Sequence, residues 1–227
     1  MSGNFLGNNC TSLSGRISSK PEFSHEVYGE GFYLVMVEVS RLSDTYDCIP
    51  VMFSERLLPL NEFQEGNTIT VEGQFRSYNN YNSDSSHKLL LTVFARDIVI
   101  TEATGDLKIP NSIFLNGFVC KKPIYRTTPF GREIADLLLA VNRAYNKSDY
   151  IPCIAWGRNA RFSEGLEVGD NFRLWGRIQS RGYQKKLESG EVLNKVAYEI
   201  SISKMEMAGQ DDEDGETDAD DEAFENR

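Results

Sequence analysis

The chain has 227 residues, 40% of them hydrophobic and 26% charged, which is long enough for two domains that each bury a core. The formal net charge of −10 argues against a nucleic-acid partner if taken alone, because phosphate binding requires clustered Lys and Arg. No stretch approaches the roughly 20 apolar residues of a membrane-spanning helix, so we expect a cytoplasmic protein with no membrane partner.

The charge is unevenly distributed along the chain. Residues 1–110 carry a net charge of −6, residues 111–207 carry +5, and residues 208–227 carry −9. A basic segment therefore lies between two acidic ones, and this asymmetry says more about partners than the total does. The basic segment is the part suited to an anionic polymer.

The two halves of the chain are an internal repeat. With a shift of 102 residues, the following residues recur in the second half: Gly15 as Gly117, Pro21 as Pro123, Gly29 as Gly131, Arg41 as Arg143, Asp47 as Asp149, and Pro50 as Pro152. With one residue inserted, Gly66 and Gly73 recur as Gly169 and Gly176. We therefore expect a first domain at 1–100, a linker at 101–110, a second domain at 111–207 and a tail at 208–227.

In the first repeat, apolar residues alternate with polar ones, and this period of two predicts strands. The expected strands are Thr11–Ser18, Gly31–Val39, Tyr46–Phe53, Thr68–Phe75 and Leu89–Ile100, with Glu55–Phe63 in the position of a short helix. The hairpin Tyr78–His87, before the last strand, is rich in Asn and Ser.

The second repeat has the same order of elements. The expected strands are Ile113–Cys120, Ile134–Val141, Tyr150–Trp156, 172–178 and Val196–Ile202, with a short helix at Arg158–Glu167 and a hairpin at Tyr183–Val192. Five strands with a helix between the third and fourth indicate an oligonucleotide-binding (OB) barrel. The expected fold class is all-β, with two tandem five-stranded OB barrels and a disordered acidic tail; an all-β sandwich is the alternative.

Aromatic and basic residues are interleaved in the second repeat. The period of two places Tyr150 and Trp156 on one face of their strand, opposite Ile151, Cys153 and Ala155, which suit the barrel interior. Such a face resembles the way proteins hold single-stranded nucleic acid, with cations along the backbone and rings under the bases. The expected binding residues are Tyr145, Tyr150, Trp156, Tyr183, Arg126, Arg132, Arg143, Arg158, Arg173, Trp175, Arg177, Arg181, Lys185 and Lys186.

Three segments of the second repeat resemble the bacterial single-stranded DNA-binding proteins. They are GFVCKKPIYRTTPFGREIADLLLAVNR at 117–143, DYIPCIAWG at 149–157 and GDNFRLWGRIQSRGY at 169–183. In that family four aromatic positions stack bases, and the resemblance carries them to Tyr150, Trp156 and Tyr183 and to the neighbourhood of Tyr145. It implies nonspecific binding of single-stranded DNA in replication, recombination or repair, by assemblies of four barrels. A dimer of this chain would supply four.

The first repeat departs from the pattern at these positions. Ser43, Cys48 and Ser54 stand where the second repeat has Tyr145, Tyr150 and Trp156. We expect the first repeat to keep the fold without most of the stacking rings. It is then either a weak DNA-binding surface, through Arg41, Arg56, Arg76, Tyr78 and Tyr81, or a surface for oligomerisation or a partner.

The tail holds ten acidic residues and one large apolar residue, Phe224, so we expect it to be disordered. The resemblance implies that its end docks replication and repair proteins. The alternative is a solubilising tail that competes with DNA for the basic face.

Enzymatic activity is not expected, because the chain lacks a Walker loop, an HExxH motif and a GxSxG elbow. Four scattered cysteines and two histidines do not form a zinc pattern, so we expect no metal or other cofactor. Two other functions stay open: a primosome-type accessory protein that uses its barrels to bind proteins, and an RNA-binding barrel, since the sequence contains nothing that would read a 2′-hydroxyl.

Overall fold

The computed structural model describes residues 7–41, 43, 45–81, 87–101, 110–186 and 190–209. This part of the chain consists mainly of β-strands, with one α-helix and one 3-10 turn. Within the same ranges, no helix has both the length and the apolar character needed to cross a membrane. Most of the expected linker, 102–109, and most of the expected tail, 210–227, lie outside the described residues.

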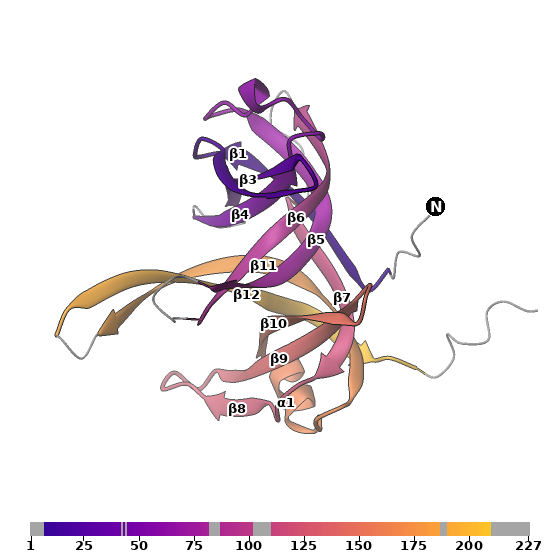
Figure 1. Cartoon of the computed structure of the whole chain (residues 1–227). Helices are drawn as coiled ribbons and strands as arrows, with labels where there is room; N and C mark the ends of the chain where they lie inside the picture. The colour runs from indigo at the N-terminus through magenta and orange to yellow at the C-terminus, as the bar shows by residue number, and fades with distance from the viewer. Residues whose placement is uncertain are drawn as a thin grey trace, which may run out of the picture.

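The first repeat forms the upper unit in Figure 1. Its elements are β1 (Asn9–Ile17), β2 (Glu22–Val27), β3 (Glu30–Ser40), β4 (Tyr46–Ser54), the 3-10 turn η1 (Leu60–Glu62), β5 (Thr68–Tyr81) and β6 (His87–Thr101). The second repeat follows with β7 (Asn111–Val119), β8 (Ile124–Thr127), β9 (Glu133–Arg143), β10 (Lys147–Trp156), α1 (Arg158–Glu164), β11 (Asn171–Lys186) and β12 (Val192–Met207).

Each repeat closes into an OB barrel, as expected. In the first, β1 pairs with both β3 and β5, and β4 pairs in parallel with β6. In the second, β7 pairs with β9 and β11, and β10 pairs in parallel with β12. The barrels close where Gly15 and Gly117 cross a neighbouring strand: a Cβ atom there would collide with the carbonyl oxygen of Glu38 or Ala140. Only glycine allows this approach.

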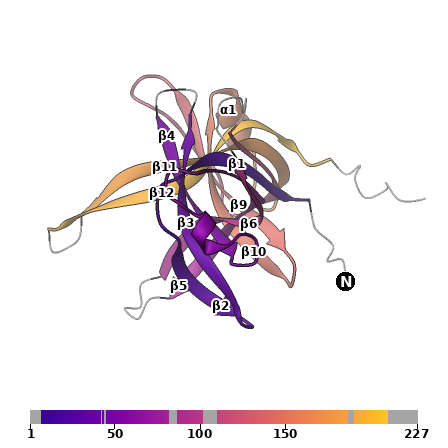
Figure 2. The ribbon, with the colours of Figure 1, turned by 90° about the horizontal axis from the view of Figure 1, so that it is seen from above.

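Some details differ from the expectation. A helix over Glu55–Phe63 is wrong, because only Leu60–Glu62 makes a 3-10 turn; Pro59 disfavours helical backbone in the residue before it. The short strands β2 and β8 were not expected. Pairing also extends into both expected hairpin loops, as far as Tyr81 opposite His87 and Lys186 opposite Val192. The β11–β12 hairpin projects away from the barrels in both views (Figures 1 and 2).

The barrels are joined by antiparallel pairing of β1 with β7, which makes one 12-stranded sheet. Thr11 pairs with Ile113, its own counterpart at a shift of 102, and the flanking pairs, Cys10 with Phe114 and Ser12 with Ser112, are counterparts of each other. The two repeats are therefore related by an approximate two-fold axis through this pair. One consequence is that strands of each repeat contact the other repeat.

Candidate nucleic-acid interface

Strand β10 presents two rings on its outer face. The side chains of Tyr150 and Trp156 are 50% and 41% exposed, whereas Ile151, Cys153 and Ala155 face the core and are buried. This is the alternation that the sequence indicated. Trp156 pairs with Ile134 of β9, and Tyr150 pairs with Ala140 of the same strand.

Tyr183 and Tyr145 both lie beyond the Tyr150 end of this surface, on two different hairpins. Tyr183 is 41% exposed and pairs with Lys195 in the projecting β11–β12 hairpin, next to the exposed Lys185 and Lys186. Tyr145 is in the turn between β9 and β10, where it is 95% exposed. Its φ of 62° and that of Asn146, 53°, are left-handed, in a turn of three residues between the paired Arg143 and Lys147. The turn therefore holds the Tyr145 ring away from the barrel.

The nominated arginines have different surroundings. Arg126 pairs with Asp136 at 2.7 Å on an exposed part of the surface, and Arg181 lies 3.6 Å from Glu199. Arg132 and Arg158 are exposed, at the start of β9 and the start of α1 respectively. Arg173 is half-buried on β11. The two that remain, Arg143 and Arg177, are at the contact between the repeats.

Asp47 is buried at that contact, with 1% of its side chain exposed. Its carboxylate accepts hydrogen bonds from Arg41 in its own repeat and, across the contact, from Arg177 at 3.0 Å and from the backbone amide of Ser180 at 2.7 Å. The Ser180 hydroxyl in turn lies 3.2 Å from the amide nitrogen of Cys48, which donates to it. Arg177 is therefore part of the contact between the barrels.

Asp149 occupies the related position in the second repeat and is fully buried. It accepts hydrogen bonds from the amide of Ser77 at 2.8 Å and from the Ser77 hydroxyl, and that hydroxyl accepts one from the amide of Tyr150 at 2.9 Å. Arg143 lies 3.3 Å away. Burial raises the pKa of the Asp149 carboxyl, against the opposing effects of Ser77 and Arg143. The sequence identified Asp47 and Asp149 as equivalent positions of the two repeats, but it did not predict that they join the repeats.

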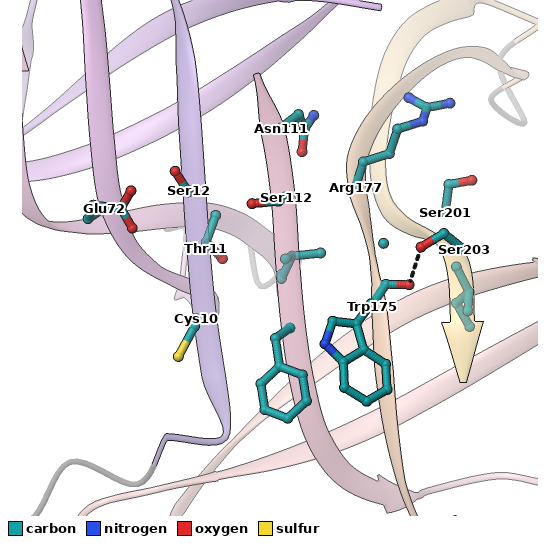
Figure 3. A pocket seen from close by; sticks show the side chains of 14 residues that line it. Cys10, Thr11, Ser12, Glu72, Asn111, Ser112, Trp175, Arg177, Ser201 and Ser203 are labelled. Atoms are coloured by element: carbon teal, nitrogen blue, oxygen red, sulfur yellow. Dashed lines mark hydrogen bonds between the residues drawn. The ribbon is translucent and has the colours of Figure 1, made fainter. Parts of the chain in front are cut away.

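Trp175 lies apart from the rings on β10. It lines a hollow of about 560 Å³ on the outer face of β1, β7, β11 and β12 (Figure 3). Its indole packs against Phe114, with ring centres 5.1 Å apart, and the Lys204 ammonium lies 4.3 Å from its ring centre. Lys204 also pairs with Glu206. On the side of the first repeat, the same hollow is lined by Ser12 on β1 and Glu72 on β5.

The described residues contain no group of three His, Cys, Asp or Glu side chains placed to hold a metal ion. All four cysteines are free thiols. Burial raises the pKa of Cys153 well above its usual range.

Comparison with known proteins gives a family for the second repeat. Residues 110–208 match the model of the single-strand binding protein family. "Single-stranded DNA-binding protein 1" of Staphylococcus aureus is 36% identical over 83 residues, which are 34% of this chain and 50% of that protein. "Single-stranded DNA-binding protein A" of Bacillus subtilis is 34% identical over 83 residues, 34% of this chain and 48% of that protein. The chain thus spans about half the length of these curated relatives.

Among solved structures, the wild-type single-stranded DNA-binding protein from Thermus aquaticus is similar over both repeats. The match covers 93% of this chain and 96% of that chain, with a TM-score of 0.67 and 19% sequence identity. At this identity the likeness concerns the fold. It extends the OB-barrel assignment to the first repeat, which the family model does not cover.

Proposed function

We propose that this protein binds single-stranded DNA without sequence preference and protects it in replication, recombination or repair, because its second repeat, residues 110–208, matches the model of the single-strand binding protein family. The role is binding rather than catalysis, and it is exercised on DNA in the cytoplasm. We take 1–100 and 111–207 as the two domains. Replication or repair enzymes are the proposed partners of the acidic segment 208–227, through Phe224.

The observation that carries this proposal is the exposure of Tyr150 and Trp156 on one face of a rigid strand. Unpaired bases stack on such rings, and each stack contributes about 1–3 kcal/mol whatever the base. Arg158 is exposed two residues after Trp156, and Lys185 and Lys186 are exposed on the projecting β11–β12 hairpin; all three are suited to phosphates. Neutralised phosphates release counterions, so the affinity falls as salt is added.

The test is a fluorescence titration of the whole chain with oligo(dT), oligo(rU) and a DNA duplex. We expect single strands alone to quench tryptophan fluorescence, and Trp156→Ala to weaken binding of oligo(dT) by about 1–3 kcal/mol. Phe23→Ala is the matched control, because Phe23 is 62% exposed on β2, a strand of the first repeat that does not pair with β10. Equal affinity for duplex, or an unchanged affinity of Trp156→Ala, would contradict the proposed site. A preference for oligo(rU) would favour RNA as the ligand.

We further propose that two copies of the chain associate through the hollow that Trp175 lines, giving four barrels. The approximate two-fold axis makes Glu72 the counterpart of Trp175, and the strand register makes Asp97 the counterpart of Lys204. One half of this face thus carries a ring and a cation, and the other half carries two exposed acids.

Two ways of stacking a second copy face to face differ in what they bring together. With one two-fold axis, the acidic half of one copy lies over the acidic half of the other. Glu72 and Asp97 of the two copies then face one another. The other places the acidic half of each copy over Trp175 and Lys204 of the other. Charge complementarity favours the second arrangement.

A further inference from the structure

The base of the projecting β11–β12 hairpin is held by side chains of the first repeat. The pairing of β11 with β7 ends at Gly176, whereas its pairing with β12 continues to Lys186. Beyond Gly176, one edge of β11 therefore has no neighbouring strand in the described part of the chain. Amide and carbonyl groups on such an edge need other partners where they are removed from water.

Two sets of side chains take the place of the missing strand. Asn111 accepts a hydrogen bond from the amide of Ile178 at 2.9 Å and donates one to its carbonyl at 2.7 Å. At Ser180, the next residue that faces this edge, Asp47 accepts from the amide at 2.7 Å and Arg41 donates to the carbonyl at 3.2 Å. An ion pair of the first repeat thus bonds to β11 as a paired strand would.

Ser180 is attached to the first repeat by its hydroxyl as well. The hydroxyl accepts from the amide of Cys48 at 3.2 Å and donates to the Asp47 carboxylate at 3.3 Å. Arg177, on the same strand as Ser180, donates to that carboxylate at 3.0 Å. We call these contacts of Arg41, Asp47 and Cys48 with Arg177 and Ser180 the Ser180 clamp. The six residues that follow it on β11, 181–186, are all exposed, so the clamp marks where the strand leaves the barrels.

The second repeat holds the first at the equivalent position. Ser77 is the counterpart of Ser180 at a shift of 103, and its amide donates to Asp149 at 2.8 Å. The Ser77 hydroxyl accepts from the amide of Tyr150, so this side of the contact reaches the ring surface of β10 directly. Each barrel thus fixes the strand from which the hairpin of the other barrel extends.

The direction of a two-stranded hairpin depends on how its base is held. Such a hairpin is marginally stable alone, and two-stranded ribbons twist more strongly than larger sheets. This hairpin carries Tyr183 three residues beyond Ser180, followed by Lys185 and Lys186. If its base were loose, a ligand would have to order these side chains on binding, and the affinity would be lower.

We propose that Arg41 and Asp47 are positioning residues. Through Ser180 they fix the direction of the β11–β12 hairpin, and so the orientation in which Tyr183 meets a nucleobase. The first repeat then strengthens binding by the second repeat without contacting the bound strand there. This inference rests on the proposed function for its ligand, but the direction of the hairpin can be measured without DNA.

The first measurement uses residual dipolar couplings of backbone amides, which report the direction of each segment relative to the barrel. In the unaltered chain we expect residues 181–186 to share the alignment of the second barrel. Asp47→Asn keeps the size of the side chain but removes the charge that holds both arginines, and should reduce the couplings of 181–186 while those of the barrel persist. Arg41→Met is a milder second variant, because Asp47 keeps its pair with Arg177, and should act in the same direction.

The second measurement is the affinity for oligo(dT) in two backgrounds. The hairpin variant Tyr183→Ala/Lys185→Ala/Lys186→Ala removes the groups that the hairpin offers to DNA. We expect Asp47→Asn to weaken binding about fivefold in the wild-type background, which corresponds to a weak base stack. In the hairpin variant it should have no further effect. A purely structural role of Asp47 would instead weaken binding equally in both backgrounds.

Glu30→Gln is the matched control. It breaks the ion pair of Glu30 with Arg56, at 3.2 Å, beside the other end of β4 from Asp47, and should change neither the couplings nor the affinity. The inference is overturned by unchanged couplings in Asp47→Asn, by equal losses of affinity in both backgrounds, or by a comparable effect of Glu30→Gln. If the wild-type chain does not bind oligo(dT), the proposed function fails, and the couplings still decide whether the first repeat positions the hairpin.

Discussion

The two repeats agree at their contact with each other and differ on their outer walls. Asp47 and Asp149 both receive a backbone amide and a hydroxyl from a serine of the other repeat, Ser180 or Ser77. The rings, in contrast, are on β10 in the second repeat and on β2, β3 and β6 in the first. Duplication therefore preserved the positions that hold the barrels together, while the positions of the rings on the outer walls changed independently.

The contact between the two repeats is not fully symmetric. The largest effect that we expect, on the free energy of unfolding, follows from this asymmetry. Asp47 is paired with two arginines, Arg41 and Arg177, whereas in the described part of the chain the ion pair of Asp149 is with Arg143. Removing one partner of a buried ion pair typically costs 3–5 kcal/mol. We expect Asp47→Ala to lower the free energy of unfolding in urea by about 3 kcal/mol, and Asp149→Ala to lower it by less. Asp136→Ala, which breaks an exposed pair, should cost under about 1 kcal/mol. Equal losses at Asp47 and Asp149 would show that the second arginine adds nothing.

The two halves of the Trp175 hollow differ in charge, which allows a test by charge exchange. We expect Glu72→Lys and Lys204→Glu each to weaken self-association about tenfold, or about 1.4 kcal/mol, as measured by sedimentation equilibrium. The combined variant should recover most of the loss, because the opposite charges then meet again. A combined variant weaker than both single ones would exclude the stacking arrangement, and a wild-type chain that is monomeric at micromolar concentration would exclude the dimer.

The pH dependence of stability gives the smallest effect. A carboxyl whose pKa is higher in the folded state than in the unfolded state keeps its proton to a higher pH when the protein is folded. Its contribution to stability therefore falls as pH rises from the unfolded-state pKa to the folded-state pKa. The pKa of Asp149 is raised by burial. We expect the free energy of unfolding of wild type, relative to Asp149→Asn, to decrease as pH rises from about 4, the value of an unfolded Asp, and then to level off. Asp136→Asn serves as the comparison, and a difference at Asp149 independent of pH would contradict the expectation.

The barrels and the exposed rings of β10 follow from local patterns in the sequence. Alternation along a strand fixes which side chains face the core, and this was enough to place Tyr150 and Trp156 outward. The repeat of 102 residues then assigned the same fold to both halves, including the half that the family model does not cover.

What could not be predicted depends on contacts between residues distant in sequence. Arg177 was nominated for its charge, but Asp47, 130 residues away, binds it. The stack of His25, Phe32, Phe94 and Arg76 is assembled from four strands, so no segment of sequence contains its pattern. One signal of the contact between the repeats was available in the sequence: each repeat has a matched Arg and Asp, which are Arg41 with Asp47 and Arg143 with Asp149. These pairs alone did not indicate which residues of the other repeat they would contact.

The pairing of β1 with β7 is made within a single polypeptide, and this limits how the barrels can be combined. Two separate identical subunits would have to carry every surface change twice, once on each side of their shared edge. Here the covalent connection keeps each barrel beside one particular, different neighbour at high effective concentration. A substitution can then be tolerated on one side of the shared sheet without its mirror image on the other. The two barrels can therefore differ in function, because each barrel is held beside the other barrel of the same chain.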